Sequence, residues 1–419
     1  MSLEISTLTK EASAGDIEAQ LQLAELYETG FGVPTDRGQA AYWYRKAAEQ
    51  GAAKAQSTLG QMYIRGIGVP EDYTEAVVWL EKAAWQGEAV AEANLAWCYQ
   101  MGLGVEVDLT EALKWYLKSA ESGHAGSRYN LGYMYANGLG TERDYAEAVS
   151  WYNKAATQGH MKAQLNVGLM YAIGQGVEKS EEKAVECYQK AAEQGYDKAQ
   201  YNLALMYAGG HGVEQDDARA ADWQLKAAMQ GYARAEFNLG LLYSYGLGLD
   251  QDYDKAVEWF TRASQQNYAK SDYQLGKMYA DGLGVTANEI ESAKYYQMAA
   301  EGGYSRAQYR LGRLYLNGHG VQRNESIACE WFEKAAMQGY VKAQYILGVC
   351  YGRGLGLAKD YVLAYAWLFL ASQSGDDFVQ KVFAKVKTKI GGDDELEAQR
   401  LANEWRAVYQ KSVTTMANQ

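Results

Sequence analysis

Proline is almost absent from this 419-residue sequence, which contains only Pro34 and Pro70. Because proline breaks helix interiors, whereas alanine and leucine favour helices, this scarcity predicts an all-helical chain. The sequence also lacks an apolar run of the roughly 18–20 residues that cross a bilayer, so we predict no membrane-spanning segment. Its start lacks the apolar core of a signal peptide. We expect a soluble protein, cytoplasmic as the sequence stands and periplasmic or secreted if a native signal peptide has been removed.

Positive charge is also in short supply. The 40 lysines and arginines are outnumbered by 52 aspartates and glutamates, which gives a formal net charge of -12. A phosphate backbone requires a strongly basic face, so this balance argues against nucleic acid as a partner.

Glycine, in contrast, is abundant and regularly spaced. Ten Gly-x-Gly motifs recur 36 residues apart without insertion or deletion, and such a period indicates a solenoid. The motifs begin at Gly30, Gly66, Gly102, Gly138, Gly174, Gly210, Gly246, Gly282, Gly318 and Gly354. We predict an all-α solenoid of ten helix-turn-helix repeats with the bounds 19–54, 55–90, 91–126, 127–162, 163–198, 199–234, 235–270, 271–306, 307–342 and 343–378.

A single repeat shows why two helices are expected. In residues 199–234, Leu203 belongs to a helical apolar stripe that ends at Gly210, and glycine enters the left-handed region without steric cost. Asp216 can cap the next helix, whose stripe contains Trp223. One hairpin cannot bury its apolar face alone, so stacked neighbours must complete the core.

Two aromatic positions are shared between repeats, and we assign both to the core. A tyrosine three residues before each Gly-x-Gly motif occurs in all ten units, from Tyr27 to Tyr351. A tryptophan of the second helix occurs in eight units, as Trp43, Trp79, Trp115, Trp151, Trp223, Trp259, Trp331 and Trp367.

The repeat resembles a known family. The pattern A-Q-Y-N-L-G…Y-x-x-G-x-G-V…D…A-x-x-W-Y-x-K-A-A-x-Q-G is similar to the Sel1-like repeat, a relative of the tetratricopeptide repeat. The resemblance implies a right-handed α/α superhelix whose first helices line a concave surface, used by an adaptor that binds other proteins. One disulfide-rich branch of the family has cysteines after Lys-Ala and after the closing glycine, and this sequence does not match that branch.

The two ends of the chain depart from the repeat. Residues 1–18 contain a segment, Ile5 to Ala14, that resembles the second helix of an incomplete repeat. Residues 379–419 follow the last repeat and extend a predicted helix that starts at Asp377, with Val379, Phe383, Val386 and Ile390 on one stripe. A further predicted helix has the stripe Leu401, Trp405 and Val408. We predict that these N- and C-terminal helices cap the exposed ends of the solenoid.

Residues that could support catalysis or bind a metal are sparse. His124 and His160 occupy one repeat position and His211 and His319 another, a whole repeat or more apart, so we predict no metal site. None is paired in sequence with a serine or cysteine nucleophile. The Gly-x-Gly motif lacks the preceding strand and third glycine of a nucleotide site, so no cofactor is expected.

The cysteines Cys98, Cys187, Cys329 and Cys350 replace mostly apolar residues. We expect buried free thiols, with a Cys329–Cys350 disulfide as an open alternative.

Three series of residues mark a candidate ligand groove. By resemblance to tetratricopeptide repeats, asparagines at the fourth position of the unit face the groove and bind a peptide main chain: Asn94, Asn130, Asn166, Asn202 and Asn238. Basic residues precede the units: Lys162, Lys198, Arg234, Lys270 and Arg306. Aromatic residues precede the fourth position in later units: Tyr201, Phe237, Tyr273, Tyr309 and Tyr345. Lys277, Arg310, Arg313 and Arg353 add charge. A solvated repeated lysine and inter-repeat packing are the structural alternatives to these interpretations.

We therefore expect a non-catalytic adaptor that binds a protein or peptide segment in the groove, such as an acidic segment or one that ends in a free carboxylate. One alternative is an exported bacterial regulatory, surface or virulence factor that binds a host or envelope protein. A second alternative is a hydrolase or binder of cell-wall or peptide-like substrates. The sequence does not define the oligomeric state.

Overall fold

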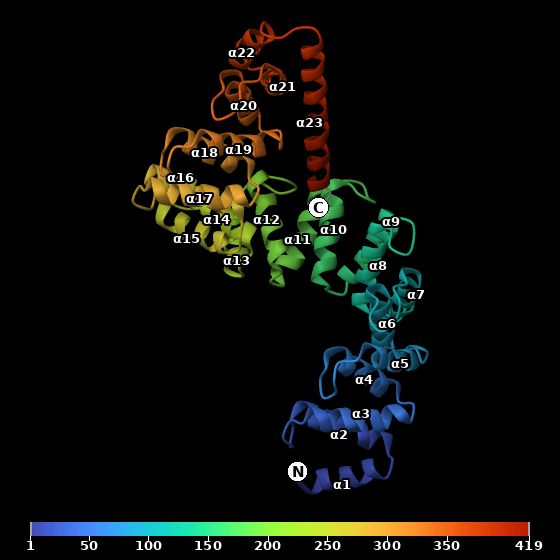
Figure 1. Cartoon of the computed structure of the whole chain (residues 1–419). Coiled ribbons are helices and arrows are strands. Elements are labelled where there is room, and N and C mark those ends of the chain that lie inside the picture. Colours follow the sequence, from blue (N-terminus) through green and yellow to red (C-terminus); the bar gives the residue numbers. More distant parts are fainter. Residues whose placement is uncertain (1, 418–419) are drawn as a thin grey trace. The chain divides into compact units, whose positions relative to one another are not determined.

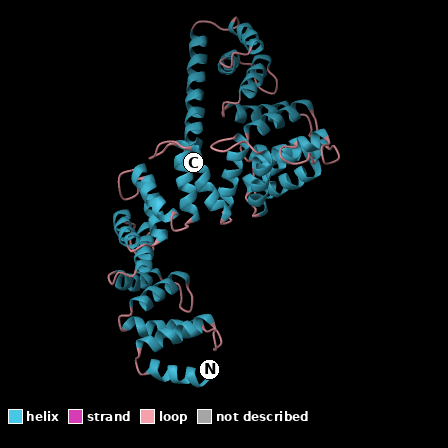
Figure 2. Cartoon of the chain, turned by 180° about the vertical axis from the view of Figure 1, so that it is seen from behind, coloured by secondary structure: helices cyan, strands magenta, loops and turns pink. Residues whose placement is uncertain are grey.

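The computed structural model consists of α-helices joined by short loops (Figures 1 and 2). It describes the backbone of residues 2–417 and the side chains of residues 5–410. Within residues 2–417 there are 23 helices and no strand. None of these helices has both the length and the apolar character needed to cross a membrane.

Each repeat supplies two helices. The first helices are α2 (Ile17–Thr29), α4 (Ala53–Arg65), α6 (Ala89–Met101), α8 (Ala125–Asn137), α10 (Met161–Ile173), α12 (Asp197–Gly209), α14 (Ala233–Tyr245), α16 (Ala269–Asp281), α18 (Ser305–Asn317) and α20 (Val341–Arg353). The second helices are α3 (Arg37–Glu49), α5 (Tyr73–Ala84), α7 (Leu109–Glu121), α9 (Tyr145–Ala156), α11 (Glu181–Glu193), α13 (Asp217–Met229), α15 (Tyr253–Gln265), α17 (Glu289–Glu301), α19 (Glu325–Ala336) and α21 (Tyr361–Ser372). The fold is an all-α repeat solenoid.

The chain forms two compact units, Met1–Gln215 and Asp216–Gln419. The first unit contains α1 (Ser2–Ser13) and the helices up to α12. The second contains α13 and all later helices, including α22 (Asp377–Lys387) and α23 (Asp393–Ala417). Within each unit, successive helices pack side by side.

The two glycines of the repeated motif have different tasks. Gly66 ends α4 in the left-handed conformation, with φ 61°, and its N–H bonds the carbonyl of Met62. Gly68 also has a positive φ, of 73°, and a Cβ there would overlap the main-chain carbonyl of Arg37 at the start of α3. The first glycine therefore stops the helix, and the second lets the turn lie against the preceding repeat.

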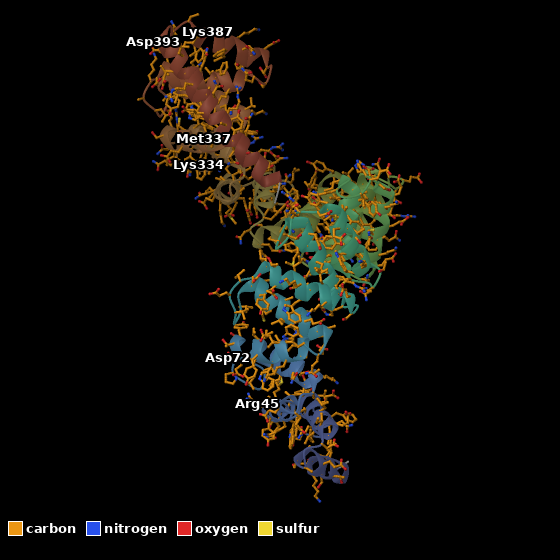
Figure 3. The ribbon with its side chains drawn as sticks, turned by 90° about the vertical axis from the view of Figure 1, so that its right-hand side faces the viewer. Arg45, Asp72, Lys334, Met337, Lys387 and Asp393 are labelled. Atoms are coloured by element: carbon orange, nitrogen blue, oxygen red, sulfur yellow. The ribbon has the colours of Figure 1, made fainter. Side chains whose placement is uncertain are left out.

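The second helices begin at side-chain caps. The Asp72 carboxylate accepts hydrogen bonds from the backbone N–H groups of Thr74 and Glu75, both at 3.0 Å, and it lies just before α5 (Figure 3). The backbone N–H of Asp72 donates to the carbonyl of Tyr63, the shared tyrosine, at 3.1 Å. Asp72 thus connects the start of α5 to the last turn of α4, and these hydrogen bonds fix the glycine turn that joins the two helices.

The shared tryptophans are buried or half-buried, and several carry a cation on one face. Lys82 Nζ lies 4.1 Å from the ring centroid of Trp79, and Lys334 Nζ lies 4.0 Å from that of Trp331. In both pairs the lysine follows the tryptophan by one helical turn, which brings the two side chains together. The W-x-x-K spacing of the repeat therefore has a structural explanation.

Most of the shared tyrosines pack against the core, but few of them are fully enclosed by it. Only Tyr63 and Tyr207 of this set are buried, and the others are half-buried. Several of their rings also contact polar side chains of the second helices. The Arg45 guanidinium donates to the Tyr63 hydroxyl, and the Tyr99 hydroxyl donates to Glu81 at 3.4 Å. A phenol hydroxyl favours this position because it needs a polar partner.

The helices outside the repeats cover the ends of the stack. Gln20 Nε2 donates to the carbonyl of Ala12 in α1 at 2.9 Å, as Gln56 Nε2 does to that of Ala48 in α3. Helix α1 therefore occupies the place of a second helix before the first repeat.

At the other end, α22 and α23 pack on the last repeat. The rings of Trp367 and Trp405 stack with centroids 4.0 Å apart. Lys387 and Asp393 flank the turn between α22 and α23 (Figure 3). Val408, expected on the buried stripe of the last helix, instead has 51% of its surface exposed.

Candidate functional site

The first helices share a stripe of four residues at spacings of four, three and four. In α10 these are Lys162, Asn166, Leu169 and Ile173, and this spacing places them on one side of a helix. We call the stripe and its equivalents the first-helix face. It contains the predicted basic residues and asparagines, whereas the predicted aromatic residues precede each asparagine position by one.

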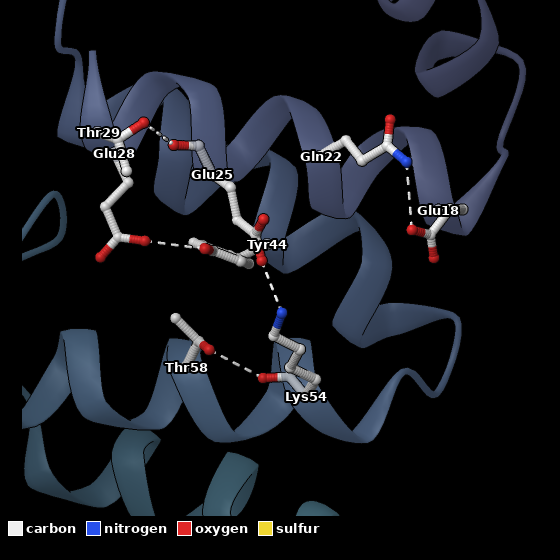
Figure 4. A network of polar contacts seen from close by, with 8 residues as sticks. All are labelled: Glu18, Gln22, Glu25, Glu28, Thr29, Tyr44, Lys54 and Thr58. Atoms are coloured by element: carbon white, nitrogen blue, oxygen red, sulfur yellow. Dashed lines mark hydrogen bonds and ion pairs between the residues drawn. The ribbon is translucent and has the colours of Figure 1, made fainter. Parts of the chain in front are cut away.

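An ion pair shows how neighbouring first helices meet on this face. Lys54 of α4 lies 2.6 Å from the Glu25 carboxylate of α2 (Figure 4). The second residue of one first helix thus reaches the ninth residue of the preceding first helix. In the same region the Tyr44 hydroxyl of α3 donates to Glu28 at 2.8 Å. Side chains from consecutive repeats therefore share one surface.

The predicted basic residues are exposed on this face. Among the described side chains, none of the five forms an ion pair: Lys162, Lys198, Arg234, Lys270 and Arg306. Their charges are consequently available to an anionic ligand, unlike that of Lys54, which is paired with Glu25.

The predicted asparagines are half-buried, and two of them contact buried tyrosines. Asn130 hydrogen-bonds the hydroxyl of Tyr116, whose pKa burial raises well above its ordinary value. Asn166 does the same for Tyr152 and Tyr129. The Tyr116 hydroxyl also donates to Oε1 of Gln100 at 3.1 Å. The two asparagines thus take part in packing within the repeats, in addition to any contact with ligand. Asn94, Asn202 and Asn238 are also half-buried.

The predicted aromatic residues pack between repeats. The Tyr273 ring centroid lies 5.5 Å from that of Tyr296 in the same repeat and 5.2 Å from that of Tyr304, which precedes the next first helix. Phe237 and Tyr309 make equivalent pairs, and Tyr345 packs on Phe378. All are half-buried, as is Tyr201.

The two compact units divide the predicted site. Asn94, Asn130, Lys162, Asn166, Lys198, Tyr201 and Asn202 lie in the first unit. Arg234, Phe237, Asn238, Lys270, Tyr273, Arg306, Tyr309 and Tyr345 lie in the second. Each unit is therefore a surface to be considered by itself.

An apolar row on the first unit was missed by the sequence analysis. Tyr133, Leu169 and Leu205 occupy equivalent positions on α8, α10 and α12 and are 44%, 40% and 42% exposed. Met101 and Ile173 extend the row at 56% and 66% exposure. The sequence does contain a signal for this row. Tyr133, Leu169 and Leu205 each directly precede a buried Met or Cys position, and the next-door position on such a helix is expected to be exposed to solvent.

The histidines serve mainly as local contacts. His124 and His160 lie at helix starts, where Nδ1 accepts the backbone N–H of Ser127 and Ala163, each at 3.2 Å. His124 also lies 2.9 Å from the Ser127 hydroxyl, but that serine is fully buried and offers no access to a substrate. Among the described residues, no three His, Cys, Asp or Glu side chains are grouped so that they could hold a metal ion.

The cysteines are free thiols. Cys98, Cys329 and Cys350 are buried, and Cys187 is half-buried. The two thiols considered as a disulfide, Cys329 and Cys350, are hydrogen-bonded to each other, and Cys329 Sγ also donates to the carbonyl of Leu355 at 3.2 Å. This pair packs as small apolar residues inside the second unit.

Comparison with known proteins identifies the repeat. A family model described as the Sel1 repeat matches ten segments of the chain: 17–51, 53–88, 89–124, 125–160, 162–196, 197–232, 233–268, 269–304, 305–340 and 341–376. The comparison with curated proteins gave no match.

Two solved structures are similar in both sequence and fold. One is a protective antigen present in uropathogenic Escherichia coli strains that displays an SLR fold. It is 32% identical with a TM-score of 0.65, and the match covers 98% of this chain and 97% of the antigen. The other is a Sel1 repeat protein from Oxalobacter formigenes. It is 33% identical with a TM-score of 0.61, and the match covers 75% of this chain and 94% of that protein.

Proposed function

Because this chain belongs to the Sel1 repeat family, whose solenoid is commonly a scaffold for protein–protein interaction, we propose that it is a non-catalytic adaptor for an extended acidic and apolar protein segment. The first-helix face is the binding surface. The observation that carries the proposal is the row of exposed basic residues without ion pairs, beside half-buried amides that can still accept and donate hydrogen bonds.

The two chemistries of the face match two parts of such a ligand. Leu169 and Ile173 offer apolar contact area on α10, and Lys162 stands on the same stripe. A segment with leucine and glutamate side chains in alternation can meet both kinds of residue. Because the chain carries a net charge of -12, an acidic ligand would be repelled elsewhere and directed to this face.

The test uses fluorescence anisotropy with labelled twelve-residue peptides that are identical except for charge. One alternates leucine with glutamate, a second has glutamine and a third has lysine in place of glutamate. We expect the glutamate peptide to bind more tightly than the other two, and the combined Arg234→Glu, Lys270→Glu and Arg306→Glu variant, altered within the second unit alone, to weaken its binding at least about tenfold. An unchanged melting temperature would show that the fold is intact.

A matched control reverses three exposed lysines of the second helices, Lys114, Lys190 and Lys294, and so introduces the same change in net charge. This control variant should bind the glutamate peptide as the wild type does. If both variants lost the same affinity for the glutamate peptide, the effect would come from the net charge of the protein, and a defined binding surface would be contradicted. Absence of binding to all three peptides would overturn the proposed ligand class.

A second candidate function follows from the similarity to a protective antigen. A protective antigen is met by the host immune system, so we propose as the alternative that this chain is exported and exposed to a host or envelope protein. Antibodies raised against the purified chain should then label intact cells of the source organism. Labelling only after the cells are permeabilised would exclude this alternative.

A further inference from the structure

A cavity of about 290 Å³ lies between α16, α17 and α18 in the second unit. The guanidinium groups of Arg310 and Arg313 line it from α18, together with Asn317 of the same helix. These three residues and Arg306 form the first-helix stripe of α18, which therefore carries three arginines and no carboxylate. Arg310 stands at the position that earlier repeats give to asparagine.

The two cavity arginines have no acidic partner. Among the described side chains, neither Arg310 nor Arg313 forms an ion pair, and the Arg310 side chain hydrogen-bonds the hydroxyl of Tyr273. Two guanidinium groups in one cavity, each with planar donors, form a receptor for an anionic oxygen group.

The other residues that line the cavity determine which charge on a ligand group would be balanced there. Ser292 and Tyr296 come from α17, and both offer hydroxyl groups. Glu289, at the start of α17, lines the same cavity and lies 4.0 Å from His319 Nδ1. The two arginines and the one glutamate of the lining together leave a single positive charge. A monoanionic carboxylate balances this charge, whereas a phosphate dianion would leave an excess negative charge beside Glu289.

The equivalent cavity one repeat earlier differs in these features. It lies between α14, α15 and α16, measures about 140 Å³ and is lined by Gln274, Lys277 and Asp281 at the positions of Arg310, Arg313 and Asn317. Its one cation is thus accompanied by a carboxylate, so no net positive charge remains. The cavity at α18 is larger and is distinguished by charge from its neighbour.

We propose that the cavity between α16, α17 and α18 binds the side-chain carboxylate of a glutamate or aspartate in a segment recognised by the first-helix face of the second unit. This inference rests on the proposed function and assigns one acidic residue of the ligand to Arg310 and Arg313. Those arginines are then specificity-determining residues of the second unit.

The experiment is a double-mutant cycle between protein and peptide. Each glutamate of the leucine–glutamate peptide is replaced in turn by glutamine, and binding is measured with the wild type and with the Arg310→Gln, Arg313→Gln variant. One replacement should weaken binding to the wild type about tenfold and have little effect on the variant, because its partner has been removed. The Lys294→Gln variant, altered on the exposed side of α17 and outside the first-helix face, should retain the wild-type response.

Two further arms determine the ligand chemistry and the fold. A peptide with phosphoserine at the sensitive glutamate should bind less tightly than the glutamate peptide, and tighter binding would overturn the assignment to a carboxylate. The charge-preserving Arg310→Lys, Arg313→Lys variant should recover part of the lost affinity. Equal melting temperatures would show that the variants are folded.

The inference and the proposed function fail in different ways. Suppose that the glutamate peptide binds and that reversal of Arg234, Lys270 and Arg306 weakens its binding. If every glutamine replacement then affects the arginine variant as it does the wild type, only the cavity assignment is wrong. If no acidic peptide binds the wild type, both are wrong.

Discussion

The side-chain amide of Gln338 donates a 2.8 Å hydrogen bond to Oε1 of Gln308, thirty residues earlier in the chain. Gln308 in turn donates to the carbonyl of Ala300 at the end of α17, at 3.1 Å. The same link joins Gln50 to Gln20, Gln86 to Gln56 and Gln194 to Gln164. A buried glutamine thus caps one second helix and accepts a hydrogen bond from the end of the next, which couples neighbouring repeats.

In the third repeat Glu92 replaces this glutamine and cannot donate when it is ionised. Its side chain is 4% exposed, and its Oε2 atom has no hydrogen-bond partner among the described residues. Burial raises the pKa of the Glu92 carboxyl above 4.5, and the nearby charge of Lys118 offsets part of the shift. We predict that Glu92→Gln raises the free energy of unfolding at pH 7.5 by about 1 kcal/mol, because the donor to the helix end is restored.

The pH dependence of this variant follows from the direction of the pKa shift. The folded state binds the Glu92 proton more tightly than the unfolded state, so the wild type loses stability as pH rises from about 4.5 through the raised pKa. The gain from Glu92→Gln should therefore be full at pH 7.5 and shrink as pH falls toward 4.5, as measured by urea denaturation. A gain that is the same at both pH values would contradict ionisation of the buried carboxyl as its cause. The reverse change, Gln56→Glu, should destabilise the protein at pH 7.5.

The second glycine of each motif offers a test of inter-repeat packing. A Cβ at Gly320 would overlap the main-chain carbonyl of Glu289 in the preceding repeat, and φ is 69°. Gly303 also has a positive φ, of 83°, but a Cβ there would meet no atom within 4 Å. We predict that Gly303→Ala costs about 1–2 kcal/mol from the backbone conformation alone. Gly320→Ala should cost roughly 1–3 kcal/mol more through overpacking.

Urea denaturation of the two glycine variants separates these contributions, because both share the left-handed backbone. Equal losses of stability would mean that the turn does not press on the neighbouring repeat. A larger loss for Gly320→Ala would show that this glycine sets the distance between repeats as well as ending the turn.

The repeated elements could be predicted because their causes are local. Gly66 ends α4 and Asp72 caps α5 through residues a few positions away, so a period in the sequence becomes a period in the structure. The contacts of Tyr273 could not be predicted in this way. Its partners Tyr296 and Tyr304 lie 23 and 31 residues later in numbering, and only the stacking of repeats brings all three rings together.

In the candidate site, too, local features could be predicted from the sequence, whereas features that depend on the packing of several helices could not. The sequence placed Lys162 and Asn166 on one helical face, and the structure has them on that stripe of α10. It also marked Arg310 and Arg313 as additional charge, but the cavity that they line requires residues of α16 and α17 as well. A cavity is a property of three packed helices, and the 36-residue pattern does not determine its volume or the side chains that converge on it.

The C-terminal helices should stabilise the last repeat. Trp405 of α23 stacks on Trp367 of α21, and Ala398 and Ala402 of α23 are fully buried. We predict that Trp405→Ala lowers the free energy of unfolding of the second unit by about 1.5–3 kcal/mol, because a half-buried aromatic ring that stacks on Trp367 is removed. Hydrogen exchange should show faster exchange first in α21 and α20, since stability in a solenoid spreads from neighbour to neighbour. Uniform acceleration along the whole chain would contradict a capping role.

Substitutions in the apolar row of the first unit should affect peptide binding but have little effect on the stability of the fold. Leu169 and Ile173 are 40% and 66% exposed, so Leu169→Ser with Ile173→Ser should change the free energy of unfolding by no more than about 1 kcal/mol. The same pair should weaken binding of the leucine–glutamate peptide several-fold, because two apolar contacts on the first-helix face are lost. As controls, Val78 on α5 and Ile290 on α17 are 41% and 69% exposed and lie on second helices. Serine at both control positions should leave peptide binding unchanged, and a similar loss in the two pairs would show that the peptide responds to exposed apolar area in general and not to this face.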